Sequence, residues 1–187
     1  MSRIRGTAQV ARFRAVLCAV LSVLAGMLSV VALASAPAQG ADLISFRAAA
    51  QSSWNQATAR TTIPTAVRAG DAMLLFVTAN KAVSVASPPQ GWVLEQTRQA
   101  RTDTVTRLYS RVALASDPGR NATITFDAAA KSSSILLAYD GTASDPIASI
   151  ASVAETSRSA SHTTPASSAA TAGSFVVSYL SRCSEDE

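Results

Sequence analysis

The chain has 187 residues, 48% of them hydrophobic, and carries 16 Lys and Arg against 12 Asp and Glu, a formal net charge of +4. Four of the arginines lie in the first fourteen residues, where there is no acid, so residues 39–187 hold 12 charges of each sign. A balanced charge without a basic cluster excludes nucleic acid as an expected partner. The 149 residues that remain after position 38 are enough for one domain with its own core.

The N-terminal segment has the three parts of a secretory signal peptide. Arginines at 3–14, an uncharged apolar stretch at 15–34 and small residues at 35–41 follow one another in that order. Ala36-Pro37-Ala38 forms an A-x-A site, so we predict a signal helix and signal peptide at 1–38 with cleavage after Ala38. Cuts after Ala36 or near Gly40 or Ala41 are alternatives. The apolar stretch, about 30 Å as a helix, is also long enough for an uncleaved anchor.

Residues 39–187 predict a single all-β domain. Short segments rich in Val, Ile, Leu, Thr and aromatic residues alternate with turns that contain Gly, Pro, Asp or Asn. No segment of residues 39–187 has an amphipathic helical stripe of about twelve residues or more, and 127–131 is expected to form one helical turn at most. The predicted strands are 43–48, 62–67, 72–78, 83–86, 92–99, 102–113, 122–127, 133–139, 147–154 and 174–180.

The pattern within these strands predicts an antiparallel β-sandwich. Ala122, Ile124 and Phe126 alternate with polar residues, as in a strand with one wet face. Residues 72–77 are continuously apolar, as in a central strand covered on both sides. Many short strands with frequent turns indicate a sandwich, either jelly-roll or immunoglobulin-like. The Ser-, Thr- and Ala-rich stretch 156–173 is expected to be a long connector.

The cysteine count excludes a fold stabilised by intrachain disulfides. Cys18 lies in the signal, so Cys183 is the single cysteine of the exported chain and no intrachain disulfide can form. The domain must therefore depend on apolar burial. We expect Cys183 to be a free thiol in a polar tail, with an intermolecular bridge as the alternative.

Four stretches together resemble a known class of module. They are Arg68-Ala69-Gly70-Asp71 with MLLFVTAN, Pro89-Gln90-Gly91-Trp92, Leu108-Tyr109-Ser110-Arg111-Val112-Ala113 with Asp117-Pro118-Gly119, and Leu137-Ala138-Tyr139-Asp140-Gly141. The series is similar to β-sandwich modules found in bacterial exported and phage tail-like proteins. The resemblance covers about residues 43–180 and implies surface attachment or ligand binding. Such modules usually continue past a strand like 174–180, so a C-terminal truncation or an open last edge is expected here.

The sequence offers little catalytic chemistry, and we expect no enzyme and no cofactor. His162 is the only histidine and lies in the connector, without a G-x-S-x-G elbow to supply a nucleophile. Structural zinc needs four Cys or His ligands, and residues 39–187 contain two. Carboxylates at Asp140 and Asp145, with Asp127, are weak candidates for calcium, because Asp-Gly and Asp-Pro are also ordinary turn sequences.

The candidate ligand-binding residues are Trp54 and Trp92. A tryptophan exposed near a loop can stack on a sugar, whereas a buried one caps the core. We therefore expect a secreted or cell-surface, non-catalytic binding or adhesion module, whose ligand is a glycan or a surface protein, without membrane contact after cleavage. The alternatives are an assembly subunit that pairs through an incomplete sheet edge, and a truncated remnant of a larger surface protein.

Overall fold

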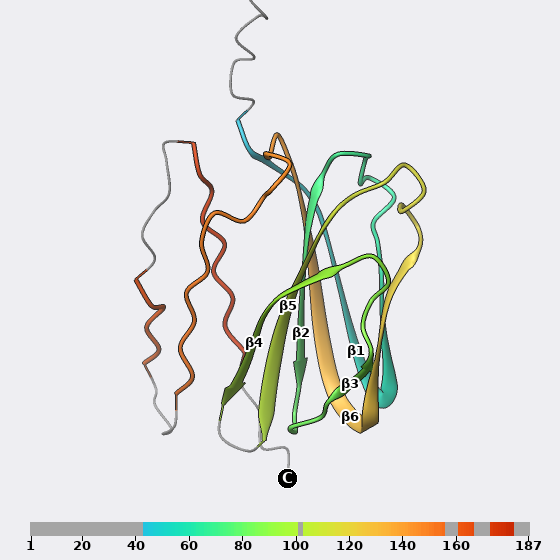
Figure 1. The fold of residues 1–187 in the computed structure, drawn as a ribbon, viewed down its shortest axis with the longest axis vertical. Coiled ribbons are helices and arrows are strands. Elements are labelled where there is room, and N and C mark those ends of the chain that lie inside the picture. Colours follow the sequence, from blue (N-terminus) through green and yellow to red (C-terminus); the bar gives the residue numbers. More distant parts are fainter. Residues whose placement is uncertain (1–42, 101–102, 156–160, 167–172, 182–187) are drawn as a thin grey trace, which may run out of the picture. The chain divides into compact units, whose positions relative to one another are not determined.

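The structure, a computed structural model, describes residues 43–100, 103–155, 161–166 and 173–181. Within these ranges all regular structure is antiparallel β, which confirms the prediction of an all-β, antiparallel domain (Figure 1). The strands form one sheet in the order β1-β6-β2-β5-β4, with β3 paired to β6. Their bounds are β1 Ser45–Thr62, β2 Ala72–Ala79, β3 Val85–Ser87, β4 Val93–Ala100, β5 Thr104–Val112 and β6 Asn121–Asp140.

β2 lies in the middle of the sheet, as its continuous apolar run predicts. It pairs with β5 on one side and with β6 on the other along its whole length. Met73, Leu75 and Val77 point into the core and are 1% exposed or less. They pack with apolar residues of β5 and of both halves of β6. The core is therefore built around this strand.

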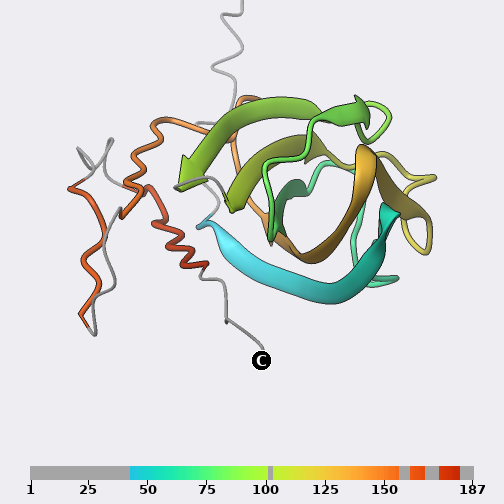
Figure 2. The same ribbon diagram turned by 90° about the horizontal axis from the view of Figure 1, so that it is seen from below.

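β1 and β6 are much longer than the sequence predicts. Residues 122–127 and 133–139 belong to one strand, and residues 127–131 between them continue it instead of forming a helical turn, so that prediction is wrong. The first half of β6 pairs with β3 and the end of β1, whereas the second half pairs with β2 and the start of β1. The β1–β6 register shifts between Gln56 and Thr58, where both strands bend. Figure 2 shows the resulting curl of the sheet.

Three predicted strands are absent from the sheet. Most of 62–67 follows β1 as a turn that closes on Arg120 and Gly119, through bonds from Ile63 N to Arg120 O and from Gly119 N to Ile63 O. Residues 147–154 and 174–180 carry strand-like sequence but form no ladder with the described strands. The prediction of a strand is therefore wrong for both segments, because a β-strand needs hydrogen bonds to a neighbouring strand as well as a suitable sequence.

The predicted alternation of faces is confirmed in the first half of β6. Ala122, Ile124 and Phe126 are all buried, while the residues between them are half-buried or exposed. In β5 the core face carries Tyr109 and also Arg107, which is only 7% exposed. Apolar patterning alone does not reveal a buried arginine.

Several predictions concern segments outside the described residues. The signal at 1–38, Cys183, and residues 156–160 and 167–172 of the connector are among them. Residues 161–166 of that connector form no helix or strand. In the part of the chain that the structure describes, no helix is long and apolar enough to span a bilayer.

Candidate binding groove at the β4–β5 end of the sheet

An open groove of about 590 Å³ lies where β4 begins and β5 ends. Its volume falls within the range of sites that hold small ligands or single side chains of a partner. Two of its sides come from the sheet and one from a loop that follows β6. The lining residues are Gly91, Val93, Glu95, Ser110, Arg111, Val112, Leu114, Ser144, Asp145 and Pro146.

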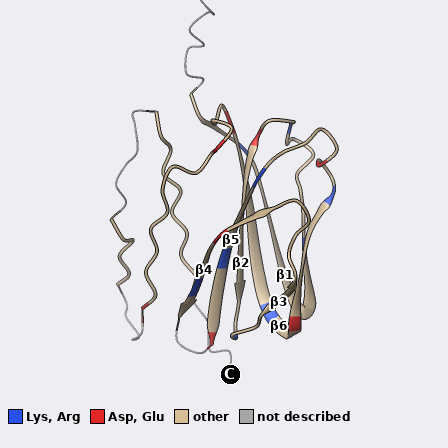
Figure 3. Cartoon of the chain, viewed as in Figure 1, with Lys and Arg blue, Asp and Glu red and all other residues tan. Residues whose placement is uncertain are grey.

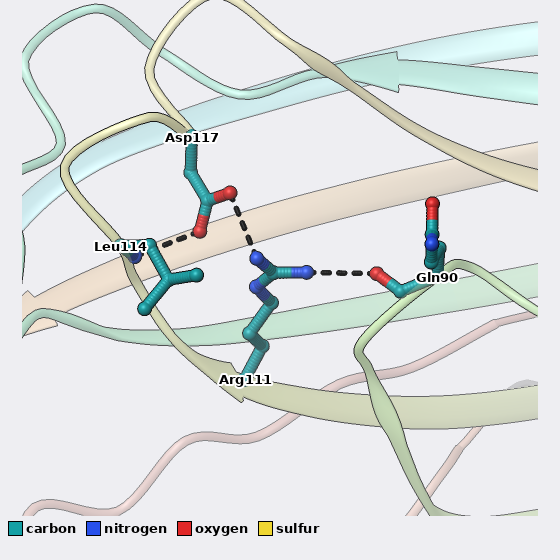
Figure 4. Close-up of polar contacts among 4 residues, drawn as sticks. All are labelled: Gln90, Arg111, Leu114 and Asp117. Atoms are coloured by element: carbon teal, nitrogen blue, oxygen red, sulfur yellow. Dashed lines mark hydrogen bonds and ion pairs between the residues drawn. The ribbon is translucent and has the colours of Figure 1, made fainter.

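Arg111 lines this groove, and its guanidinium is held by hydrogen bonds to two other segments (Figure 4). Its Nη2 donates to Asp117 Oδ1 at 2.9 Å, and its Nη1 donates to the carbonyl oxygen of Gln90 at 2.7 Å. Asp117 is 3% exposed, and its Oδ2 accepts a bond of 2.8 Å from the amide of Leu114. The guanidinium thus ties the turn before β4 to the turn after β5.

Gly91 makes this close approach possible. A β-carbon at position 91 would collide with Nη1 of Arg111, and the residue has a φ of +76°, which L side chains rarely adopt. The Pro-Pro-Gln-Gly sequence is one of the Gly- and Pro-containing turns that the sequence predicts. Its glycine has the additional role of leaving room for the arginine.

The walls of the groove are partly apolar and exposed. Val93 is 60% exposed, Leu114 is 56% exposed, and Val112, which also lines the groove, is 38% exposed. Glu95 accepts a hydrogen bond of 2.5 Å from the hydroxyl of Ser110, which fixes the carboxylate against β5. The site therefore offers apolar contacts beside one oriented acid and one paired arginine.

The two tryptophans are placed apart in the sheet order, and neither lines the groove. Trp54 lies in β1 at one end of the order and donates its Nε1 proton to the carbonyl oxygen of Arg60 at 2.8 Å. Trp92 directly precedes β4 at the other end. Both rings are half-buried and pack against the core. The structure thus gives each of them a structural contact.

The carboxylates named as calcium candidates have other partners or stand alone. Asp140 lies 2.6 Å from Nη2 of Arg47, whose Nε lies 2.6 Å from the buried Asp71. Desolvation acts to lower the pKa of Arg47, but Asp71 and Asp140 outweigh it and the pKa is raised. Asp127 accepts from the amide of Ser84 at 3.0 Å. Asp145 is exposed at the groove.

His162 lies within hydrogen-bonding distance of Glu155. Its Nδ1 lies 2.6 Å from Glu155 Oε2, and both side chains are about a third exposed. An acid that orients an imidazole is one part of a hydrolytic triad, but such a triad also needs a positioned nucleophile. Across the described ranges, no cluster of three or more His, Cys, Asp or Glu side chains could hold a metal ion.

The interior of the sheet contains polar groups that sequence reasoning missed. The hydroxyls of Ser52, Thr61 and Ser134 lie within 3.1 Å of one another and join β1 to β6. A second open hollow, of about 390 Å³, is lined by two of them, Ser52 and Ser134, together with Gln51, Ser53, Ser133 and Ile135. Further along the core face, burial lowers the pKa of Arg107, against the effects of Tyr109 and Asp127. The Arg107 guanidinium donates to the carbonyl oxygen of Val83.

Sequence reasoning quoted several groove residues for another purpose. Gly91, Arg111 and Asp117 all belong to the stretches that carry the module resemblance. No local signal indicates that they meet, because positions 91 and 111 are joined only by pairing of β4 with β5. Comparison with known protein families, curated proteins and solved structures finds no match to this chain.

Proposed function

We propose that this chain is an exported, non-catalytic binding or adhesion module of a bacterial surface, which contacts a protein ligand through the groove at the β4–β5 end. The signal-like residues 1–38 support export, and the module resemblance supports a role in attachment. An adhesin, whether secreted or held at the cell surface, needs no cofactor. The observation that carries the proposal is the groove with its hydrogen-bonded arginine and its exposed apolar wall.

A protein ligand suits the groove better than a glycan. Sugar-binding sandwiches commonly present exposed rings, but the lining here contains no aromatic residue, and Trp54 and Trp92 pack against the core. Val93, Val112 and Leu114 instead suit an apolar side chain of a partner, and the groove floor is preorganised by Arg111. A preformed site avoids much of the ordering cost of binding.

We also propose that the domain is a β-sandwich, in which residues 174–181 begin the second layer. Tyr179 stacks on Phe76 of β2 with ring centroids 4.4 Å apart, and its hydroxyl lies 3.0 Å from that of Thr78. Ser181 reaches Thr106 of β5 at 2.9 Å, and Phe175 lies 5.3 Å from the ring of Tyr139. The segment therefore runs along β2 on the face opposite the core.

Exposure along this segment alternates with period two. Val177, Tyr179 and Ser181 are half-buried, whereas Val176 and Leu180 are 69% and 66% exposed. Period-two alternation is typical of an extended strand that covers a surface with one face. Residues 174–181 thus have the placement and the side-chain pattern of a second-layer strand without a ladder.

Binding to cells tests the function. The exported chain, labelled with a fluorophore, should bind saturably to cells of the bacterium that carries the gene, and protease treatment of those cells should abolish binding. Leu114→Asp should weaken binding at least tenfold, because it places a charge on the apolar wall. Leu43→Asp is the matched control, since Leu43 is 86% exposed and does not line the groove.

Two results would contradict the proposal. If binding survived protease but was lost after removal of surface glycans, the ligand would be a glycan. If neither intact cells nor cell-wall material bound the chain saturably, the module would not be an adhesin.

A further inference from the structure

In the part of the chain that the structure describes, β4 is the last strand of the sheet order on one side, and its start is apolar on both faces. Val93 pairs with Ser110 and Leu94 with Tyr109, so the two side chains point to opposite sides of the sheet. Yet Val93 is 60% exposed and Leu94 is 52% exposed. A partner lying on one face would cover only one of them. A strand added beside β4 would flank both and would also pair the backbone groups of the edge.

β4 carries two charged residues of opposite sign, Glu95 and Arg98 (Figure 3). Arg98 is opposite Thr106 in the ladder, and Gln96 is opposite Leu108, so both point to the face away from the core. Glu95 is the extra residue of the register shift between Leu94 and Gln96. Its bond to Ser110 holds it on that same outer face.

These positions make the strand complementary to itself. If two β4 strands pair antiparallel around a two-fold axis at Thr97, Gln96 of each copy lies opposite Arg98 of the other. Glu95, beside Gln96, then meets that arginine, and the contact occurs twice. Leu94 is opposite Gln99 and Val93 is opposite Ala100 in the same register. Every opposed pair shares a face, as antiparallel pairing requires.

We propose that two copies of the exported chain associate through their β4 edges in this register and form one continuous sheet. The balanced charge of residues 39–187 leaves no net repulsion to oppose the association. Opposite charges placed across neighbouring strands stabilise a pairing, and like charges disfavour it. The Glu95–Arg98 contacts therefore select this register over one centred on Arg98, which would oppose two arginines.

The association is expected to be weak. A single pair of eight-residue edges buries less than the roughly 1,600 Å² of a standard stable interface. The register shift near Leu94 also leaves only Gln96–Ala100 as a regular ladder. Dimers should therefore form at high protein concentration and dissociate on dilution.

Charge exchange provides the first test, by sedimentation velocity at high concentration. Arg98→Glu and Glu95→Arg should each sediment as a monomer, because each variant brings like charges together in both contacts. An equimolar mixture of the two variants should recover the dimer, because both contacts then regain opposite signs. A monomeric wild-type chain at high concentration, or two single variants that dimerise as well as the wild type, would overturn the proposal.

A cysteine cross-link tests the register independently of those charges. In a Cys183→Ser background, Thr97→Cys should form a disulfide dimer under mild oxidation, because position 97 lies on the two-fold axis and faces its own copy. Adjacent antiparallel residues have Cα atoms about 4.5–5.5 Å apart, which a disulfide can span. Gln99→Cys is the matched control on the same face of the strand and should cross-link far more slowly.

Equal rates for the two cysteine variants would overturn the register, and no cross-link in either would overturn pairing through β4. Neither experiment involves a ligand of the groove. Dimerisation could thus fail while Leu114→Asp still weakened binding to cells, or the reverse, so the two proposals are tested separately.

Discussion

At the scale of single residues, Asp117 shows how a short polar side chain organises the groove. It is buried, yet both of its oxygens are used, one by the amide of Leu114 and the other by Arg111. A buried carboxylate with two donors avoids the cost of an unpaired charge. The same residue therefore closes the turn after β5 and positions the guanidinium that crosses to Gln90.

Replacing Asp117 should destabilise the domain in a graded way. Asp117→Ala leaves the Leu114 amide and the Arg111 guanidinium without their acceptor, and we expect it to lower the free energy of unfolding by roughly 2–3 kcal/mol. Asp117→Asn keeps an acceptor oxygen for the amide and should cost about half as much. Urea denaturation measures both. Ser116→Ala, an exposed neighbour in the same turn, should change stability by less than about 0.5 kcal/mol.

If all three variants had the same stability, Asp117 would have no organising role. Sequence reasoning identified Asp117-Pro118-Gly119 as a turn, which the structure confirms. The sequence indicates no role for the Asp117 side chain. Its partner Arg111 lies before the turn, and their contact depends on the direction in which β5 ends.

At the scale of secondary structure, sequence prediction worked where local pattern and tertiary environment agree. The strands at 72–78 and 92–99 match β2 and β4 within one residue at each end, because apolar or alternating runs are bounded by clear turns. The middle of β1, AAQSSWNQATAR, was missed, since Ala, Gln, Asn and Arg are poor signals for a strand. Pairing with β6 extends it regardless.

The same effect explains the wrong helical turn at 127–131. Asp127-Ala128-Ala129-Ala130-Lys131 contains good helix formers, but Lys131 and Ala130 pair with Asn55 and Gln56 of β1. Tertiary pairing overrides a weak local preference. The reverse happened at 147–154, where a suitable strand sequence meets no described strand with which to form a ladder.

Residues 174–181 provide a test at this scale, because their attachment to the sheet depends on side chains rather than a ladder. Tyr179→Ala removes the ring stacked on Phe76 and the hydroxyl beside Thr78, so we expect it to lower the free energy of unfolding by roughly 2 kcal/mol. Leu180→Ala, next in sequence but pointing away from the sheet, should have little effect. Chemical denaturation followed by tryptophan fluorescence measures both.

A cost at Leu180 equal to that at Tyr179 would mean that the segment does not present alternate faces to the sheet. The proposed second layer would then lose its support. A selective cost at Tyr179 would show that a single extended segment contributes to stability as a covering strand would.

At the scale of the whole molecule, charge gives the clearest contrast between the full chain and residues 39–187, the part that we predict to be exported. The basic character of the full sequence comes from four arginines at positions 3–14, and residues 39–187 are neutral overall. A net charge of zero leaves no repulsion between two copies, which favours the proposed association. It also gives no general attraction to a polyanion, which favours a protein as the proposed ligand. Removal of the signal is therefore part of the function that we propose.

Export should yield a product that begins at Gln39. Small side chains at Ala36 and Ala38 fit the subsites of signal peptidase, and we expect the preceding apolar stretch to place them at the outer face of the membrane. Mass spectrometry of the protein from the culture medium or cell surface should give the mass of residues 39–187. Replacing both alanines by Phe should block processing and leave a larger, membrane-associated precursor. Ala49→Phe, beyond the predicted cut, should be processed normally, and a wild-type product that retained Met1 would show that the segment is an anchor.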